Sequence, residues 1–476
     1  MGSERGFLEI DRVDKTYAPV EERIKHYKEF AIRPSIKQLE SQGARCMDCG
    51  IPYCHAMGCP LGNLIPEWND LVYKGQWKTA YERLSATSEF PEFTGRICPA
   101  PCETSCTMSI NSAPVTIQEI ELAIIERAFK EGWVVPEPPT IETGKRVAVI
   151  GSGPAGLTAA SKLRKLGHEV TVFEKSDRIG GLMRYGIPEF KLEKKFIDRR
   201  LEIMKAEGVR FETEVSIGED ISADYLRRSF DAILIAVGAG KPRDIPAGGR
   251  GLEGIYFAME YLTKSNKYCE GDMDFGEIIS ARDKNVLVIG GGDTGSDCVG
   301  TAIRQGARSV KQIEIMPKPQ EWNEPNNPYW PDWPKTLRTS TSHKEGCERD
   351  WGIMTSYFTG MGVNVQRAYL SRVEWAENKF NGRMEMKEIP GSEFDIPVEL
   401  VLIAAGFVHL EGGELIKALD PRMDPRGNVE TNGRGETSIP GVFAAGDAAS
   451  GASLVVRAME SGRIASESIH EYLLQL

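Results

Sequence analysis

One stretch of the chain decides its fold, VAVIGSGPAG at residues 147–156. Its apolar half predicts a buried strand, its glycines predict a tight turn, and the sequence after it predicts a helix. Gly151 permits the sharp turn, Gly153 lets the backbone approach a pyrophosphate, and Gly156 lets the helix pack on the strand. The helix begins at Pro154-Ala155, where free N–H groups and a partial positive charge favour phosphate.

A second apolar strand follows at residues 168–173 and ends at Glu174, next to Lys175. An acid about 20 residues after such a turn can accept hydrogen bonds from an adenosine ribose. A glycine turn alone could serve only close packing, but here strand, turn, helix, strand and acid occur in order. The stretch therefore predicts a dinucleotide site.

The same pattern returns at residues 285–295, NVLVIGGGDTG, and a strand at residues 310–315 follows its helix. The nucleotide contacts expected in this second unit are Gly290, Gly292, Asp293, Thr294, Gly295 and Glu314. Two dinucleotide folds in one chain imply two dinucleotides. The natural pair is a bound flavin and an exchanging nicotinamide.

The bulk composition excludes several classes of protein. At 476 residues the chain is too long for one core and suggests about three domains. The net charge is −11 and no stripe of Lys and Arg occurs, so nucleic acid is not an expected partner. No apolar run is long enough to span a membrane, and the first residues lack the apolar core of a secretory signal. We therefore expect a cytoplasmic protein whose ten cysteines are thiols or metal ligands rather than disulfides.

Seven of the ten cysteines fall within 61 residues: Cys46, Cys49, Cys54, Cys59, Cys98, Cys102 and Cys106. Thiolates suit either zinc or iron–sulfur clusters. Structural zinc usually takes two CxxC knuckles or Cys/His pairs, and only one CxxC occurs here. Cys-Pro occurs twice, as in ferredoxin-like runs, so the spacing favours clusters. Seven thiolates are one short of two four-cysteine sites.

The segments around the cysteines are expected to be helical. An arm with a helix at residues 21–30 should precede them, and apolar periodicity predicts helices at residues 65–74, 77–85 and 117–131. A proline-rich linker at residues 134–144 then leads to the first dinucleotide fold.

Matched stretches predict that the nicotinamide domain interrupts the flavin domain. AVG at residues 236–238 and AAG at residues 404–406 each follow an apolar strand and mark the two crossings. The expected architecture is α/β, with a helical domain followed by two Rossmann-like domains. The expected limits are 1–140 for the helical domain, 141–250 and 405–476 for the flavin domain, and 251–404 for the nicotinamide domain.

Glycine-containing stretches outside the first turn are also expected beside the flavin. Their residues are Gly181, Leu182, Gly238, Gly446 and Asp447. A helix at about residues 453–473 should follow the last two. A long loop rich in Pro and Trp, residues 317–335, is expected to pack beside the nicotinamide site or a partner.

With these residues in hand, the chain resembles the small (β) subunit of glutamate synthase over almost its whole length. The resemblance rests on both glycine motifs, on Gly446-Asp447, and on the stretches GARCMDCG at 43–50, NLIPEWND at 63–70 and GRICPAPCE at 95–103. The same module is similar to the N-terminal half of dihydropyrimidine dehydrogenase. It is also similar to the large subunit of an electron-bifurcating, NADH-dependent ferredoxin:NADP oxidoreductase.

The resemblance implies FAD at the first motif, with Glu174 on the adenosine ribose and Asp447 on the ribityl chain, and NADH or NADPH at the second. It also implies two [4Fe–4S] clusters with interleaved ligands. One ligand set is Cys46, Cys49, Cys54 and Cys106, and the other is Cys59, Cys98, Cys102 and a non-cysteine residue. Glu121 matches the family position of that residue, and Glu119 is the alternative.

In the activity that the resemblance implies, NAD(P)H gives a hydride to the flavin, and the clusters take the electrons singly. No side chain need act as a catalytic acid or base. In glutamate synthase the electrons reach a large subunit, which makes glutamate from glutamine and 2-oxoglutarate. The alternatives are a subunit of the bifurcating complex or another such redox complex, and a zinc-stabilised scaffold. A flavin-dependent disulfide reductase would need a cysteine pair beside the flavin, and residues 180–190 contain no cysteine.

The resemblance also bears on the choice between NADH and NADPH. NADPH-using relatives carry an Arg-Arg pair just after the second strand of the nicotinamide domain. Ile315 and Met316 occupy that place here. Glu314, one residue earlier, could accept hydrogen bonds from a free 2′-OH and would repel a phosphate. Lys318 could replace the arginines only in part, because it lacks their fork. The sequence therefore predicts a preference for NADH.

Overall fold

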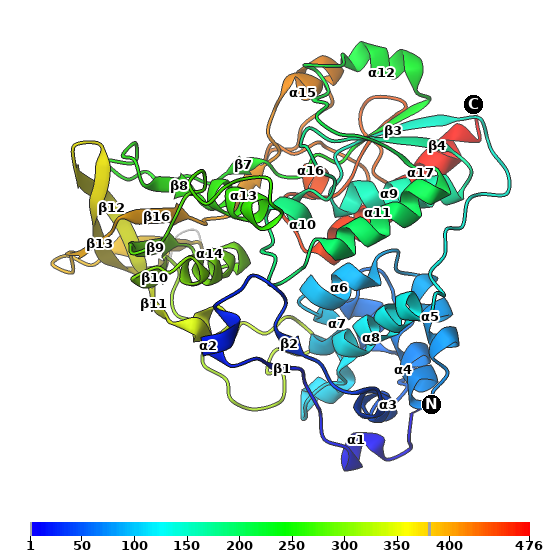
Figure 1. Cartoon of the computed structure of the whole chain (residues 1–476), viewed down its shortest axis with the longest axis horizontal. Helices are drawn as coiled ribbons and strands as arrows, with labels where there is room; N and C mark the ends of the chain where they lie inside the picture. Colours follow the sequence, from blue (N-terminus) through cyan, green and yellow to red (C-terminus); the bar gives the residue numbers. More distant parts are fainter. Residues whose placement is uncertain (1, 379–381) are drawn as a thin grey trace.

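The computed structural model describes residues 2–378 and 382–476. Figure 1 shows a helical body, coloured blue to cyan, and two further bodies that are each built on a sheet. Within the described residues, no helix is long and apolar enough to cross a membrane.

The helical body carries the clustered cysteines. Its main helices confirm the expected ones: α4 spans Ile65–Tyr73, α5 spans Trp77–Ser85 and α8 spans Ile117–Lys130. The shorter elements are α3 Ile36–Ala44, a π-helical turn Cys54–Gly58, α6 Pro91–Ile97, α7 Pro101–Thr104 and a 3₁₀ turn Thr107–Ile110. Trp68 and Ile120 are fully buried between these helices, so the apolar stripes read from the sequence face one core.

The arm before the cysteines differs from the helix expected at residues 21–30. Its elements are α1 Gly6–Glu9, β1 Thr16–Tyr17, α2 Val20–Arg23 and β2 Ala31–Ile32, with β1 and β2 paired. The helix ends early because Arg23 enters a buried site, where its Nε donates to Glu345 at 2.7 Å. Glu345 also accepts from Arg304 at 2.6 Å. These distant ion pairs override the local helix propensity.

The first sheet is parallel, with strand order β18-β6-β3-β4-β5. Its strands are β3 Arg146–Ile150, β4 Glu169–Phe173, β5 Arg210–Glu212, β6 Ala232–Ile235 and β18 Val442–Ala444. Its helices are α9 Pro154–Lys165, α10 Leu182–Tyr185, α11 Lys195–Glu207, α12 Ala223–Ser229, α15 Glu414–Leu419, α16 Asp447–Ser450 and α17 Val455–Leu473. Because β18 comes from the end of the chain and pairs with β6, the residues between them form an insertion, as predicted.

The insertion contains the second parallel sheet, with order β11-β10-β9-β16-β8. Its strands are β8 Ile255–Phe257, β9 Asn285–Ile289, β10 Ser309–Glu314, β11 Cys347–Trp351 and β16 Leu400–Ile403. Its helices are α13 Ala258–Cys269, α14 Asp293–Arg304 and a 3₁₀ turn His343–Glu345. Val288 and Leu402 in its central strands are fully buried, which explains why these strands read as continuous apolar runs.

An antiparallel sheet, which the sequence did not predict, extends the second sheet body. Its strands are β12 Ile353–Met361, β13 Asn364–Glu377, β14 Met384–Glu388 and β15 Phe394–Pro397. β12 and β13 lie at the left end of the molecule in Figure 1. Where the chain passes between the sheet bodies, β7 Lys241–Pro242 pairs with β17 Phe407–His409, next to the two expected crossings.

Candidate cofactor and electron-transfer sites

The first glycine turn joins β3 to α9 and requires glycine for steric reasons. Gly151 has a φ of +104°, and a Cβ there would stand 2.4 Å from the carbonyl oxygen of Ala236. A Cβ on Gly156 would stand 2.0 Å from the carbonyl oxygen of Gly151, so α9 could not approach β3. A Cβ on Gly153 would meet no protein atom within 4 Å. The open side of Gly153 is therefore where a pyrophosphate can approach the backbone.

Glu174 follows β4 and bonds to this turn. Its Oε2 accepts from the backbone N–H of Ser152 at 3.2 Å and from the Ser152 hydroxyl at 2.5 Å. Its Oε1 accepts from the backbone N–H of Ser176 at 2.9 Å. The carboxylate is thus held at the mouth of the turn with lone pairs left for ribose hydroxyls, which fits its predicted role.

Two further predicted flavin contacts crowd the same turn. A Cβ on Gly181 would stand 2.9 Å from Gly153 Cα, and one on Gly446 would stand 2.7 Å from Ala155 Cβ. Asp447 begins α16 and accepts from Ser453 Oγ at 2.7 Å, and burial raises its pKa.

The other predicted flavin contacts differ in how close they lie to the first glycine turn. Pro154 stands in the first turn of α9, Leu182 begins α10 with its side chain part exposed, and Gly238 has a φ of +75° with open space beside it. Lys175 differs from them, because its side chain is 72% exposed and its Nζ lies 3.8 Å from Glu411 Oε2. Lys175 therefore faces solvent rather than the turn.

The second glycine turn, between β9 and α14, repeats the same constraints. Gly290 has a φ of +123°, and its Cβ would stand 2.2 Å from the carbonyl oxygen of Ala404. A Cβ on Gly295 would stand 2.3 Å from the Gly290 carbonyl oxygen, whereas one on Gly292 would meet no protein atom within 4 Å. Asp293 and Thr294 form the start of α14, whose N–H groups face this open side.

Glu314 occupies in the second sheet the place that Glu174 occupies in the first. Strand pairing aligns Ile150 with Phe173 and Ile289 with Ile313, and each glutamate is the next residue. Glu314 Oε2 accepts from the Gly291 backbone N–H at 2.5 Å, and Oε1 accepts from that of Met316 at 3.0 Å. The sequence interpretation set Glu314 one residue early, but its bonds match those of Glu174.

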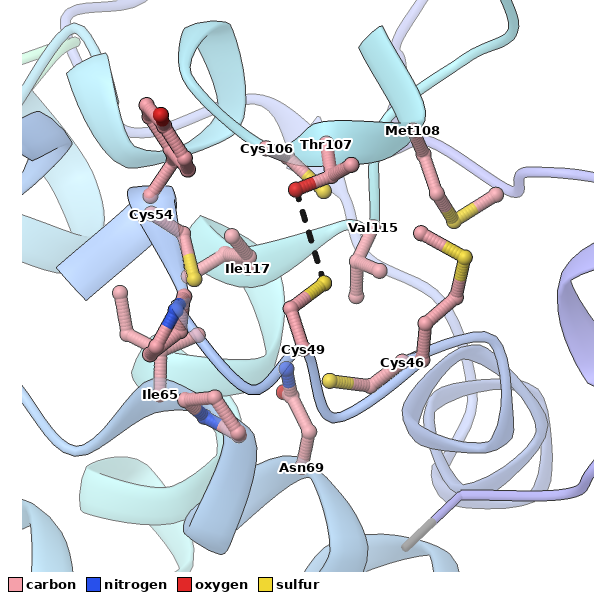
Figure 2. A pocket seen from close by; sticks show the side chains of 14 residues that line it. Cys46, Cys49, Cys54, Ile65, Asn69, Cys106, Thr107, Met108, Val115 and Ile117 are labelled. Atoms are coloured by element: carbon pink, nitrogen blue, oxygen red, sulfur yellow. Dashed lines mark hydrogen bonds between the residues drawn. The ribbon is translucent and has the colours of Figure 1, made fainter. Parts of the chain in front are cut away.

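Four cysteines line the first cavity of the helical body: Cys46, Cys49, Cys54 and Cys106. Figure 2 shows these side chains around the cavity, contributed by separate segments of the chain. Burial raises the pKa of Cys46 to about 11 and that of Cys54 further. Thiols in such a place ionise readily only beside a compensating positive charge, such as iron.

The second cavity is lined by Cys59, Cys98, Cys102 and Glu121. Glu121 is 6% exposed and accepts from Thr94 Oγ1 at 2.5 Å. Burial raises the pKa of Glu121 to about 7.

Glu119, the alternative ligand, is engaged elsewhere. Its carboxylate accepts from Lys15 Nζ at 2.7 Å and from Arg33 at 2.9 Å. Of the two glutamates, Glu121 is therefore the one that lies with the three cysteines of the second cavity.

The two donor sets fit iron–sulfur clusters better than single ions. Across residues 2–378 and 382–476, no three His, Cys, Asp or Glu side chains stand close enough to hold one metal ion. A [4Fe–4S] cluster binds each ligand through a different iron, so its ligands stand around a larger space. Both cavities have that form.

The two cavities share a wall. Ile65 of α4 and Ile117 of α8 line both of them, so apolar side chains separate the two sets of cysteines. Val456, in the first turn of α17, lines only the second cavity. The second cavity is therefore the one that adjoins the first sheet body.

The Pro- and Trp-rich loop, which was expected beside the nicotinamide site or a partner, packs on segments that form the wall of the first cavity. Trp330 Nε1 donates to the carbonyl oxygens of Ser105 at 3.2 Å and Cys106 at 3.1 Å, and its ring lies 4.9 Å from that of Tyr53. The Asn327 backbone N–H donates to the Ser109 carbonyl oxygen at 2.6 Å. These partners lie more than 200 residues apart, so no local pattern could have indicated them.

Comparison with known proteins decides the family. A family model described as "Pyridine nucleotide-disulphide oxidoreductase" matches residues 145–462, and one described as dihydropyrimidine dehydrogenase domain II, 4Fe-4S cluster, matches residues 23–133. The "Glutamate synthase [NADPH] small chain" of Mycobacterium tuberculosis is 50% identical over 460 residues, which cover 96% of this chain and 93% of that protein. The chain belongs to the glutamate synthase small-chain family.

The likeness extends beyond separate small chains. "Glutamate synthase [NADH]" of Schizosaccharomyces pombe is 44% identical over 477 residues, which cover 98% of this chain and 22% of that protein. The names of these two glutamate synthases thus include NADPH in one case and NADH in the other. The solved structure of Mycobacterium tuberculosis FprA in complex with NADPH matches 70% of this chain and 85% of its own, with a TM-score of 0.55 and 17% identity. That likeness shows the fold alone.

This glutamate synthase small-chain relative has the fold of a disulfide reductase without the cysteine pair that such an enzyme needs beside its flavin. All ten cysteines are free. Cys269 ends α13, Cys298 is fully buried in α14 and Cys347 begins β11. The remaining seven line the two cavities of the helical body.

Proposed function

We propose that this chain is the electron-input subunit of a glutamate synthase, which oxidises NAD(P)H and delivers electrons to a large subunit that makes glutamate from glutamine and 2-oxoglutarate. Bound FAD would supply a hydride acceptor, and two [4Fe–4S] clusters would supply one-electron carriers. The observation that carries the proposal is the pair of adjoining cysteine-lined cavities, one of which touches α17 of the first sheet body.

The FAD site would be formed around the first turn. Its residues are Gly151, Gly153, Pro154, Ala155, Gly156, Glu174, Gly181, Leu182, Gly238, Gly446 and Asp447. The open side of Gly153 and the start of α9 bind the pyrophosphate, and Glu174 accepts from the adenosine ribose. Asp447 accepts from the ribityl hydroxyls, and the surrounding glycines let the backbone lie close to the cofactor.

The lining of the two cavities supports the proposed cluster ligands. Cys46, Cys49, Cys54 and Cys106 would hold one cluster, and Cys59, Cys98, Cys102 and Glu121 would hold the other. Val456 lines only the second cavity, so a cluster there would lie nearer to the first sheet body and would supply the first one-electron carrier. Ile65 and Ile117 would separate it from a cluster in the first cavity, which would supply the carrier farther along the path to the partner.

The nicotinamide would bind at the second turn, and we propose that NADH is preferred. Glu314 supports this, because its carboxylate stands where Glu174 stands in the flavin unit, ready to accept from a free 2′-OH. Lys318 does not replace the missing arginine pair, since its Nζ donates to Glu321 Oε1 at 2.5 Å.

The proposed domain limits are 1–140, 141–250 with 405–476, and 251–404. They agree with the residues of each sheet, because every strand of the second sheet lies between Ile255 and Ile403. The reactions that make glutamate from glutamine and 2-oxoglutarate are assigned to the large subunit, which is the expected partner.

The test is cofactor content after anaerobic purification. We expect close to one FAD and about eight iron atoms per chain, because each cluster holds about four. Zinc in place of iron would refute the proposal and support a scaffold. Co-purification with a partner that reduces ferredoxin, instead of a glutamate-forming large subunit, would support a bifurcating complex.

A further inference from the structure

The side-chain amide of Asn69 is buried beside a cysteine sulfur. Asn69 lies on α4 and is fully buried. Neither its Nδ2 nor its Oδ1 makes a hydrogen bond of normal geometry with a described residue, and the amide lies close enough to Cys46 to lower the pKa of that thiol. An amide removed from water without a hydrogen bond is strongly disfavoured, so a partner is expected in the loaded protein.

The position of Asn69 indicates that partner. Asn69 lines the first cavity with Cys46, Cys49, Cys54 and Cys106. Figure 2 shows its amide pointing into the space beside the sulfurs of Cys46 and Cys49. Thr107, on the opposite side, already has a sulfur partner, because its Oγ1 lies 3.5 Å from Cys49 Sγ. Asn69 is thus a polar side chain of this cavity that approaches a sulfur without yet making a hydrogen bond of normal geometry.

We propose that the Asn69 amide donates an N–H hydrogen bond to a sulfur of the cluster in the first cavity and raises its reduction potential. This inference rests on the proposed function. Reduction adds one electron, taken from the neighbouring cluster, and no proton moves. An N–H dipole aimed at sulfur stabilises the more negative, reduced form more than the oxidised form. Asn69 is therefore a positioning and tuning residue, and it favours electron flow from the second cavity to the first.

The adjacent residue provides a matched control. Trp68 is also fully buried on α4 and its Nε1 has no partner within the described part of the chain, but Trp68 lines the second cavity. Trp68→Phe removes a buried indole N–H and Asn69→Leu a buried amide from the same helix turn. Only Asn69→Leu should change the cluster of the first cavity.

The experiment is a reductive titration of the full chain, followed by EPR. The signal that changes in Glu121→Ala is assigned to the second-cavity cluster, and the other signal is assigned to the first-cavity cluster. In Asn69→Leu we expect the reduction equilibrium of the first-cavity cluster to fall about tenfold, which is about 59 mV for one electron. Trp68→Phe should leave that potential unchanged. Full iron content with an unchanged first-cavity potential in Asn69→Leu would overturn the inference.

A second measurement covers the case in which Asn69→Leu fails to load iron. Pulsed EPR of the wild-type chain carrying ¹⁵N in its asparagine side-chain amides should show a ¹⁵N coupling to the first-cavity cluster, because Asn69 is the asparagine that lines that cavity. Absence of that coupling in iron-loaded wild-type protein would overturn the inference. A wild-type chain without iron would instead refute the proposed function, so the two failures are distinguishable.

Discussion

Replacing Glu314 tests how the nicotinamide site discriminates between nucleotides. The 2′-phosphate of NADPH carries roughly −1.5 to −2 charges and would lie beside a carboxylate that two backbone N–H groups hold in place. Unit charges about 4 Å apart repel by about 1 kcal/mol in water and about 4 kcal/mol near a protein surface. Glu314 is half-buried, so we take about 2 kcal/mol, which is roughly a 30-fold weaker binding of NADPH.

We therefore expect wild-type protein to use NADH with the higher kcat/KM in a diaphorase assay. Glu314→Gln should shift the NADPH/NADH ratio of kcat/KM by about 30-fold toward NADPH, because it removes the repulsion. Glu314→Arg should shift it by more, about a hundredfold, because it also adds an attraction. The ratio is the informative quantity, since either change also weakens the bonds to Gly291 and Met316 and lowers the activity with both nucleotides.

Glu348 provides the matched control. It lies on the neighbouring strand β11, is exposed and pairs with Lys311 at 2.9 Å. Glu348→Gln removes the same charge from the same sheet but away from the turn, so the ratio should stay at its wild-type value. A wild-type kcat/KM for NADPH equal to or above that for NADH, or an unchanged ratio in Glu314→Gln, would refute the reasoning.

Four further predictions concern the other sites. Glu121→Ala should lower the iron content from about eight toward about four atoms per chain, or alter one EPR signal, while FAD stays bound. Glu119→Ala should leave the iron content unchanged. The opposite pattern would make Glu119 the ligand. Gly156→Ala should destabilise the fold by about 3 kcal/mol, measured by thermal unfolding, because its Cβ meets a carbonyl oxygen. Gly153→Ala should fold normally and lose FAD, and full flavin content would show that no phosphate approaches there. The isolated chain with NADH should reduce ferricyanide without forming glutamate, and any glutamate formed would place the amination in this chain.

The sequence predicted the parts of the fold that depend on local rules. Each glycine turn is fixed by contacts within its own unit, such as the approach of Gly156 to Gly151, so its pattern is readable without a structure. The insertion was also predictable, because each of the two crossings is an apolar strand followed by Ala, a second apolar residue and Gly. Helices α4 and α5 were predicted within a residue, since each presents one apolar stripe to a core.

Other features depend on contacts that no local pattern records. The helix expected at residues 21–30 was wrong because Arg23 reaches Glu345, 322 residues away. The family resemblance pointed to Glu121 as the non-cysteine ligand and left Glu119 as the alternative, since both are acids near the start of one helix. What separates them is their surroundings: Lys15 and Arg33 bind Glu119, whereas Thr94 and three cysteines surround Glu121.

The Pro- and Trp-rich loop shows how the nucleotide site and the first cavity are joined. On one side, Trp330 donates to the carbonyl oxygen of Cys106, in the wall of that cavity. On the other, Ser340, just beyond the loop, shares a 2.7 Å hydrogen bond with Ser296 in the first turn of α14. The same chain segment thus contacts both α14, whose start is the proposed nicotinamide site, and the peptide of Cys106, a proposed cluster ligand. We therefore expect this loop to hold the proposed nucleotide-binding helix in place relative to the helical body, which gives a structural role to three tryptophans in a segment without regular structure.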